Sequence, residues 1–484
     1  MSVDRNSFET VIGLEVHCEL LTATKLFCGC PNVFGEEPNT NICPVCLGLP
    51  GSLPVLNSQA VELAMRIGLA LNCEIRPSSF HRKNYFYPDQ AKDYQISQYD
   101  EPINSNGFLE LPDGSRVGVT RAHLEEDTGK TTHVGGGGRV HSAERSLVDY
   151  NRSGVPLVEI VSEPDIRSGP QARAYVSELR SILVATRATD GKMEEGSMRV
   201  DANISVRPLG ATEFGTRCEV KNLNSLRSLT RAIEYEAARQ IELINNGEEV
   251  QQETRHWDED SSSTSSMRSK EEAYDYRYFP EPDLVRLAPD DAWIASVRES
   301  LGPLPASRRA KLVSLLGGSP SGPEMDQVLA TVELDLDFLV IEAAKAGAPV
   351  ALALARASNE VASNLDALRS LDPAAFSTTV VMESKGDLSS TQAKAVIAEL
   401  MSTGRTDPVA VAREKGFEAM SGDSIAQEVA KAVSEAPQEW KRYLSGEEKL
   451  SQFFIGKVMK ATRGKANGKD VVAELRRLSA SEAE

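Results

Sequence analysis

The chain has no run of apolar residues long enough to cross a membrane. The longest candidate, Ala348–Ala355, is far shorter than the ~20 residues that a spanning helix needs. The first ten residues, M-S-V-D-R-N-S-F-E-T, lack the basic and apolar regions of a secretory signal. These two absences predict a cytoplasmic protein with no membrane partner.

Positive charge is outnumbered by negative charge, and the cysteines are few. The chain has 53 Lys and Arg against 71 Asp and Glu, a net charge of −18, so it is not a general nucleic-acid-coating protein. Any contact with nucleic acid therefore needs a local basic patch. Seven cysteines, an odd number in 484 residues, argue against a disulfide framework. The length allows two or three domains with a large core.

The stretch Val11–Leu20, V-I-G-L-E-V-H-C-E-L, alternates with a period of two. One face is apolar, and the other carries Glu15, His17 and Glu19. Residues two apart on a strand are separated by roughly 6.6 Å, so two of them can hold one cation. This pattern is typical either of a metal-binding strand or of an edge strand with a solvated polar face.

Acidic side chains recur in later segments that we expect to be strands. Val117–Asp127 ends in three acids, which repel one another unless a cation is bound, so Glu126 or its neighbour Glu125 is a second candidate ligand. Glu159 lies among apolar neighbours in Val155–Glu163, where an unpaired carboxylate is costly to bury. Glu159 is therefore a third candidate.

Two further segments, Arg199–Arg207 and Arg217–Lys221, alternate in the same way. Their polar faces mix acids with basic and amide side chains, among them Arg199, Asp201, Asn203, Glu219 and Lys221. Acids on such a face can hold cations, and the basic side chains can hold phosphate oxygens. Because an antiparallel sheet can leave one face open, we expect these strands to form a ligand-binding face.

Four cysteines follow the first strand in the pattern C-x-C-x12-C-P-x-C. They are Cys28, Cys30, Cys43 and Cys46. Two closely spaced pairs suit tetrahedral coordination of zinc, and four thiolates leave no open position, so such a zinc would be structural. Reduced structural thiols or a redox pair are the alternatives. The other cysteines, Cys18, Cys73 and Cys218, are expected in the core.

Helical spacing alternates with these strands and then replaces them. The expected helices include Ala60–Asn72, Pro170–Thr189 and Ser225–Asn246, whereas the serine-rich Ser261–Ser266 is expected to be a loop or lid. Beyond about residue 293 helical spacing dominates. We predict an α+β protein with domains at 1–292, 293–405 and 406–484, and a cysteine knuckle at 28–46.

Two segments carry clustered basic side chains. Lys83 precedes an aromatic cluster in H-R-K-N-Y-F-Y-P-D, residues 81–89, which is either a strand or a loop that meets a phosphate or a base. Residues 455–469 hold five basic residues and no acid, namely Lys457, Lys460, Arg463, Lys465 and Lys469. In so acidic a chain this segregation favours contact with a phosphate backbone, with a solvated helix face as the alternative.

Seven long motifs together resemble one family, the B subunit of the bacterial glutamyl/aspartyl-tRNA amidotransferase (GatB). The similarity covers essentially the whole chain and is densest over residues 8–290. The motifs are V-I-G-L-E-V-H, R-K-N-Y-F-Y-P-D with Y-Q-I-S-Q, H-L-E-E-D-x-G-K, P-L-V-E-I-V-S-E-P-D-I, K-M-E-E-G-S-M-R-V-D-A-N-I-S, E-V-K-N-L-N-S and D-Y-R-Y-F-P-E-P-D-L.

The resemblance implies an antiparallel-sheet cradle related to glutamine synthetase catalytic folds, then an all-α domain and a small helical tail that holds tRNA. It implies that ATP phosphorylates the side-chain carboxylate of Glu on tRNA(Gln) or Asp on tRNA(Asn). Ammonia then displaces the phosphate. A separate glutaminase (amidase) subunit of the same complex supplies the ammonia, and a small third subunit joins the two. The cysteines resemble the zinc-binding version of the family.

The resemblance also implies roles for single residues. Mg²⁺ is expected on Glu15, His17, Glu126 and Glu159, which with Arg199 and Asp201 form the catalytic set. By position, ATP and the acyl phosphate are expected at Arg199, Asp201, Asn203, Glu219 and Lys221, whereas Lys83 and Tyr85 are expected to guide ammonia or the aminoacyl end. Two alternatives remain, a non-catalytic zinc-knuckle tRNA-binding module and a free-standing ligase acting on a small acid.

Overall fold

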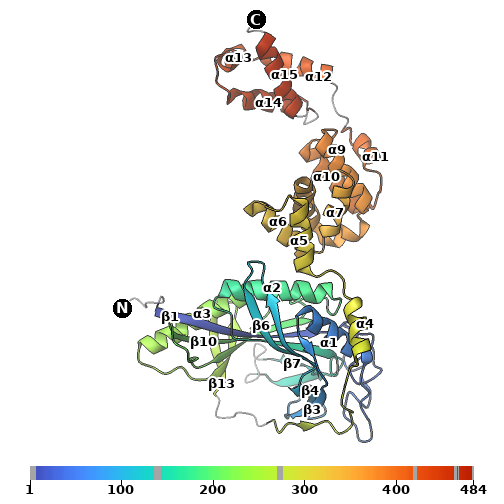
Figure 1. Cartoon of the computed structure of the whole chain (residues 1–484), viewed down its shortest axis with the longest axis vertical. Helices are drawn as coiled ribbons and strands as arrows, with labels where there is room; N and C mark the ends of the chain where they lie inside the picture. The colour runs from blue at the N-terminus through green and yellow to red at the C-terminus, as the bar shows by residue number, and fades with distance from the viewer. Residues whose placement is uncertain are drawn as a thin grey trace. The chain divides into compact units, whose positions relative to one another are not determined.

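The computed structural model forms two compact units, Met1–Pro305 and Ala306–Glu484 (Figure 1). It describes residues 7–135, 143–269, 276–417, 422–462, 466 and 468–481. Within these residues, no helix combines the length and the apolar character that a bilayer crossing requires.

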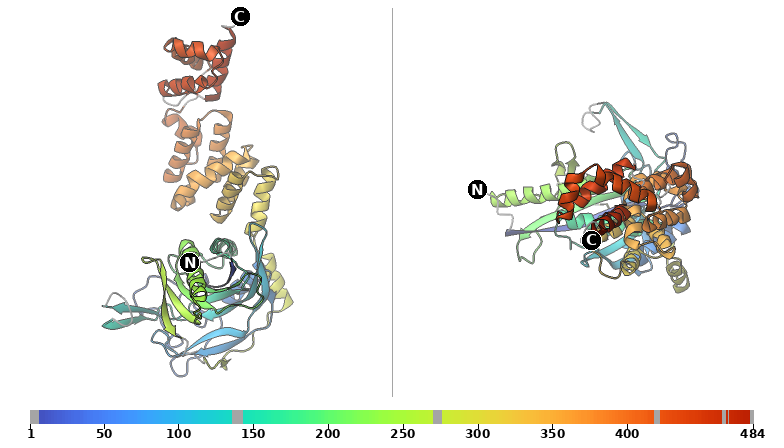
Figure 2. Two further views of the ribbon diagram at one scale, coloured as in Figure 1. Left: turned by 90° about the vertical axis from the view of Figure 1, so that its left-hand side faces the viewer. Right: turned by 90° about the horizontal axis from the view of Figure 1, so that it is seen from above.

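A large and mostly antiparallel sheet forms the first unit. Its main path of described strands is β13 (Ser263–Ser269), β12 (Glu253–Asp258), β11 (Cys218–Leu223), β10 (Met198–Pro208), β1 (Phe8–Glu19), β9 (Pro156–Ser162), β6 (Arg116–Glu126), β4 (Tyr94–Glu101), β3 (Ser79–Asn84) and β14 (Phe279–Pro280). β5 (Asn104–Glu110) pairs with β6 and with β2 (Glu74–Ile75). The β11–β12 pair is parallel. A separate ribbon, β7 (Lys130–Val134) with β8 (Arg145–Asp149), projects from the body of this unit (Figure 2).

The strand β1 lies in the interior of this sheet and shows the predicted alternation. Its apolar side chains Ile12, Leu14 and Val16 are fully buried. The opposite face meets two antiparallel neighbours in register, with Glu15 opposite Asp201 and His17 opposite both Arg199 and Glu159. The register therefore places charged residues from three strands on one face of the sheet.

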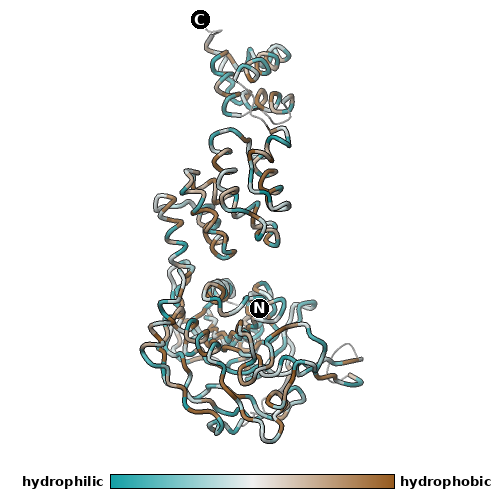
Figure 3. Tube along the Cα trace, turned by 90° about the vertical axis from the view of Figure 1, so that its right-hand side faces the viewer, coloured by the Kyte–Doolittle hydropathy of each residue, from teal (hydrophilic) through white to brown (hydrophobic). Residues whose placement is uncertain are grey.

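The apolar face of the sheet is covered by helices (Figure 1). These are α1 (Ser58–Ala70), α2 (Gly169–Ala185) and α3 (Leu226–Asn245), and α4 (Asp291–Glu299) packs against α1. The first three begin at side-chain N-caps, since Asn57, Ser168 and Ser225 accept hydrogen bonds from backbone amides of the first turn. Hydrophobic segments accordingly gather in the interior of this unit (Figure 3). Cys18, Cys73 and Cys218 are buried, as predicted.

The serine-rich segment 261–266 is not the predicted loop or lid. From Ser263 onward it forms β13, which pairs antiparallel with β12 at the sheet edge. Thr264 accepts a hydrogen bond from Arg255 at 2.7 Å and donates one to the buried Glu236 of α3 at 3.0 Å. The prediction was wrong because serine composition gives no sign of a neighbouring strand or of a partner beneath it.

The second unit contains only helices among its described residues. They are α5 (Pro305–Leu315), α6 (Gly322–Glu333), α7 (Asp337–Lys345), α8 (Val350–Arg356), η4 (Ala357–Val361), η5 (Ala362–Ser370), α9 (Pro373–Lys385), α10 (Ser390–Thr403), α11 (Pro408–Glu414), α12 (Gly422–Ser434), α13 (Pro437–Leu444), α14 (Leu450–Ala461) and α15 (Gly468–Ser481). One core includes residues from Leu312 to Ala412, and another includes residues from Ile425 to Leu475. The predicted order of a sheet followed by helices is confirmed, and the three-domain division stays a prediction.

Gly68 allows α1 to pack closely against the sheet, because it has no side chain at the point of contact. A Cβ at Gly68 would overlap the side chain of Asn104. Asn104 is fully buried, and its amide nitrogen donates to the carbonyl oxygens of Ala64 at 3.0 Å and Ala122 at 2.8 Å, so it has little freedom to move. We expect Gly68→Ala to lower the free energy of unfolding by about 1–3 kcal/mol, measured by calorimetry.

The matched control is Gly456→Ala, the same change in α14 where no atom lies within 4 Å of the added Cβ. This variant is expected to gain roughly 0.5–1 kcal/mol, because alanine restricts the unfolded chain and favours helix. Equal shifts in the two variants would contradict the close contact.

Candidate functional site

A histidine and two glutamates meet on the polar face of the sheet. His17 Nε2 of β1 lies 3.6 Å from Glu125 Oε1 of β6 and 3.9 Å from Glu159 Oε2 of β9. One ligand atom from each of the three residues lies within 4.8 Å of the others, which is close enough to hold one metal ion. We call these three residues the histidine cluster.

His123 supports the histidine cluster and was missed in the sequence. Its Nε2 lies 3.3 Å from Glu159 Oε2, and the residue is 1% exposed. The register pairs Glu159 with His17 on one side and with His123 on the other. The sequence did contain evidence for His123, because His123 and Glu125 are two residues apart on a predicted strand and their side chains must therefore lie on the same face.

Glu126 does not join this cluster, contrary to the prediction. The alternation of β6 places its side chain on the opposite face, where it is 3% exposed. There it accepts a hydrogen bond from the backbone amide of Ile96 at 2.9 Å and forms an ion pair with Lys92. Glu125, which the sequence left as the alternative, takes the place beside His17.

A second acidic cluster lies beside the first and contains Glu15, which the prediction had grouped with His17. Its members are Glu15, Asp201 and Glu219, whose carboxylate oxygens lie within 4.8 Å of one another. Lys221 Nζ is 2.7 Å from both Asp201 Oδ2 and Glu219 Oε1. Asn203 Nδ2 donates to Glu15 Oε1 at 2.9 Å. This all-oxygen set, which we call the carboxylate cluster, suits Mg²⁺, and Lys221 would have to move aside for it.

The pKa values of the acids differ according to their partners. Burial raises the pKa of Glu125 to about 8, and the nearby charge of Glu159 adds to this effect. Burial also favours the neutral form of Glu159, but His123 and His17 outweigh it and hold the pKa of Glu159 below its usual range. Burial raises the pKa of Glu15 and lowers that of His17. Burial and neighbouring carboxylates thus disfavour the charged forms of Glu125 and Glu15, which a bound cation would favour.

Arg199 lies at the end of this face, fixed by an acid. Its Nη2 donates to Asp127 Oδ2 at 2.9 Å, and Arg152 Nε lies 3.4 Å from the same oxygen. A hollow of about 500 Å³ opens beside Glu19 and Arg152. Burial and the charge of Asp127 raise the pKa of Glu19 to about 7. The predicted Arg199 is therefore near the histidine cluster, in a site that also contains Asp127.

Lys83 and Tyr85 belong to an aromatic wall at the other side of the histidine cluster. Lys83 Nζ lies 4.8 Å from the centre of the Tyr276 ring, and the rings of Tyr85 and Tyr276 are 6.3 Å apart. Tyr99 and Tyr278 stack at 4.4 Å. The positive charge of Lys83 is among the influences that lower the pKa of Glu125, but burial and the charge of Glu159 outweigh it. Arg121 lies 5.5 Å from the centre of the Tyr99 ring, so the aromatic wall has both a lysine and an arginine against its rings.

A smaller hollow of about 250 Å³ lies beside the carboxylate cluster. Glu15 and Asn203 line it at one side, and Phe214 and Arg217 are among its other lining residues. An aromatic ring, a guanidinium and neighbouring carboxylates are the chemical groups that a nucleotide with its metal would contact.

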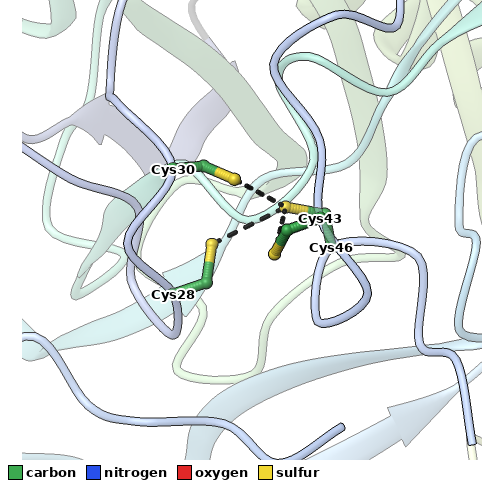
Figure 4. Close-up of side chains that lie close together, drawn as sticks. All are labelled: Cys28, Cys30, Cys43 and Cys46. Atoms are coloured by element: carbon green, nitrogen blue, oxygen red, sulfur yellow. Dashed lines mark hydrogen bonds between the residues drawn. The ribbon is translucent and has the colours of Figure 1, made fainter.

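The four cysteines of the knuckle come together as the spacing predicted (Figure 4). Cys46 Sγ lies 3.6 Å from the sulfurs of Cys28 and Cys43 and 3.8 Å from that of Cys30. A tetrahedron with Zn–S bonds of ~2.3 Å has sulfurs roughly 3.8 Å apart, so this set fits zinc. All four residues are free cysteines, and four thiolates would leave zinc no open position.

The basic residues of the tail are described in part. Lys457 on α14 lies 3.2 Å from Glu435, and Lys460 on the same helix is exposed. Lys469 belongs to α15. Arg463 and Lys465 lie outside the described residues.

Comparisons with known proteins cover both units. The model of the GatB/GatE catalytic domain matches residues 10–295, and that of the GatB domain matches residues 340–478. The chain is 48% identical to the B subunit of the aspartyl/glutamyl-tRNA(Asn/Gln) amidotransferase of Brevibacillus brevis, over 96% of this chain and 97% of that protein. Proteins of the same name from Thermodesulfovibrio yellowstonii and Nocardia farcinica are 48% and 49% identical, over 96% and 95% of this chain and 97% and 94% of theirs.

The raised pKa of Glu125 generates a prediction about metal binding. With a pKa of about 8, Glu125 holds a proton at pH 7 and must lose it to bind a cation. Mg²⁺ binding is therefore expected to release about one proton at pH 7 and less at pH 9, and its affinity should fall as the pH falls below 8. Titration calorimetry in two buffers with different ionisation enthalpies measures this release.

Glu125→Gln should abolish the proton release, whereas Glu249→Gln, an exposed glutamate outside both clusters, should leave it unchanged. An equal release from wild type and Glu125→Gln would rule out Glu125 as the source.

Proposed function

This chain belongs to the GatB family, and from that premise we propose that it is the part of a tRNA amidotransferase that activates the misacylated tRNA. It phosphorylates, with ATP, the side-chain carboxylate of Glu on tRNA(Gln) or of Asp on tRNA(Asn). The observation that carries the proposal is the pair of acidic clusters on one face of the sheet, with Arg199 and Lys221 beside them.

A carboxylate reacts poorly with ammonia until its oxygen becomes a leaving group. Phosphoryl transfer from ATP forms a bond from a carboxylate oxygen to phosphorus and releases ADP. Ammonia then forms the carbon–nitrogen bond, and phosphate leaves with the electrons of the broken carbon–oxygen bond. Mg²⁺ held by the two clusters would neutralise negative charge on the phosphates.

The chain's own residues position these groups. His123 contacts Glu159 and fixes that carboxylate in the histidine cluster. Asn203 holds Glu15, and Thr254 Oγ1 holds Glu219 by donating to it at 2.9 Å. Arg199 and Lys221 are the cations available for oxygens of the phosphate being transferred. The hollow beside Phe214 and Arg217 is the proposed nucleotide position, adjacent to the carboxylate cluster.

Ammonia and tRNA come from outside the chain in this proposal. No segment of the sequence resembles the Gly/Ser-rich nucleophile segment of an amidase. A glutaminase subunit of the complex therefore supplies ammonia, and a small third subunit joins it to this chain. Lys83 and Tyr85 guide ammonia or the aminoacyl end to the histidine cluster. Lys457, Lys460 and Lys469, with Arg463 and Lys465, contact the tRNA backbone.

The finer features of the architecture belong to the same proposal. We propose that the sheet is a cradle related to glutamine synthetase catalytic folds, that the helical region divides near residue 405, and that the protein works in the cytoplasm. The four cysteines hold a structural zinc outside the reaction.

Two other functions fit the chain less well. A passive zinc-knuckle module that only holds tRNA would gain nothing from two clusters of carboxylates, which repel phosphate. A free-standing ligase for a small acid would leave the basic tail without a role.

The first experiment compares neighbouring glutamates in the complex purified with its partner subunits. With ATP, Mg²⁺ and Glu-tRNA(Gln), Glu125→Gln is expected to slow amide formation by about 100-fold or more. The change removes a proposed Mg²⁺ ligand and so weakens the stabilisation of negative charge on the phosphate being transferred. Glu126→Gln should lower thermal stability, since it leaves Lys92 buried without its ion pair, but keep the rate per folded molecule near wild type. Hydroxylamine traps the acyl phosphate and reports the first step directly.

Wild-type rates from a correctly folded Glu125→Gln would refute the assignment of the histidine cluster. Binding of tRNA with no trapped acyl phosphate in the wild-type complex would instead favour the passive module. Assays with Asp-tRNA(Asn) in parallel show which misacylated tRNA is the substrate.

The second experiment tests the tail without disrupting it. Removing residues 455–484 would delete Val458, Val471 and Leu475 from a core, so charge removal at the surface is the sharper change. Lys457→Gln with Lys460→Gln should weaken tRNA binding and reduce the slope of log affinity against log salt by about 1–2, with ATP hydrolysis unchanged.

Lys345→Gln, an exposed lysine on α7, is the control for loss of positive charge. Unchanged tRNA affinity in the double variant would count against the tail and in favour of a small-molecule ligase.

A further inference from the structure

Lys25 is a fully buried lysine next to the four cysteines. The residue is 0% exposed, and its ammonium donates to the carbonyl oxygen of Asn41 at 2.9 Å and to Cys46 Sγ at 3.5 Å. Among the described residues it forms no ion pair with a carboxylate. An ammonium buried without water or a negative partner is very costly, so the sulfur is the group that can balance its charge.

The sulfur that Lys25 contacts is central to the cysteine group. Cys46 is the one of the four that is buried, at 4% exposed, and its sulfur contacts the other three. Zinc bound by four thiolates carries a net charge of −2, because four negative ligands exceed the charge of the ion. A buried centre of this charge needs a nearby cation or hydrogen-bond donors. Lys25 supplies both at one sulfur.

We propose that Lys25 is a positioning residue of the four-cysteine site, whose charge stabilises the Cys46 thiolate and raises the affinity of the site for zinc. The ammonium contacts the metal ligand and not the metal. The proposal concerns the knuckle alone and does not depend on the amidotransferase reaction.

The same lysine joins the two halves of the knuckle. Its backbone amide donates to the carbonyl oxygen of Cys30 at 3.0 Å, on the first cysteine pair, while its side chain reaches Asn41 and Cys46, at the second pair. The backbone amide of Asn41 donates to Asn151 Oδ1 at 2.9 Å. Lys25 is therefore linked, through Asn41, to Asn151. The next residue along the chain is Arg152, whose guanidinium lies 3.4 Å from Asp127.

The test measures zinc affinity by competition with a chromophoric chelator. Lys25→Met keeps the aliphatic chain and removes the charge and the donor, and it should weaken zinc binding by about 10- to 100-fold. Lys25→Gln keeps a donor without the charge and should fall between Lys25→Met and wild type. Lys130→Met, the same change at an exposed lysine outside the knuckle, should match wild type. Equal affinity of wild type and Lys25→Met, or an equal loss in Lys130→Met, overturns the proposal.

A second measurement covers the case in which Lys25→Met does not fold. Wild type and Lys25→Gln are then loaded with Co²⁺, and the sulfur-to-cobalt charge-transfer absorption is compared. Removal of the Lys25 ammonium next to the Cys46 thiolate should shift this band, because the electron density on that sulfur changes. An unchanged band together with unchanged zinc affinity in folded Lys25→Gln overturns the proposal.

Discussion

Mutual repulsion among carboxylates on one face of the sheet is the constraint on which the rest of the first unit depends. The register of β1 with β9 and β10 brings Glu15 opposite Asp201 and His17 opposite Glu159. Burial of Ile12, Leu14 and Val16 fixes this register, because a slip of one residue would turn the acids into the core. The hydrophobic core thus holds together negatively charged groups that would otherwise separate.

Different partners on the two faces of β6 give adjacent glutamates different roles. Glu125 faces His17 and Glu159, and burial together with the charge of Glu159 raises its pKa to about 8. Glu126 faces inward, where Lys92 and a backbone amide satisfy its charge. The first belongs to a group of side chains close enough to hold one metal ion, and the second is paired with Lys92. Strand geometry alone separates these functions by one position.

The knuckle shows the same balance of charge on a smaller scale. Four sulfurs and a buried lysine lie close together, and neither group is stable there without a counter-charge. Contacts from this region reach the segment around Asn151, at the end of the sheet face. The arrangement of the four-cysteine group is therefore linked to the segment around Asn151 through the hydrogen bond of Asn41.

Local patterns in the sequence determined the period-two strands, the capped helices, the four-cysteine spacing and the helical character beyond residue 293, since each follows from neighbouring residues and the burial they require. Only the tertiary structure decided which acids meet, because this depends on strand register and face. It divided Glu15 and His17 between two clusters and placed Glu125, not Glu126, beside His17. It also paired a serine-rich segment into β13 and placed Lys25 against Cys46. Contacts between residues distant in the chain carry no local signal, and these contacts form the site.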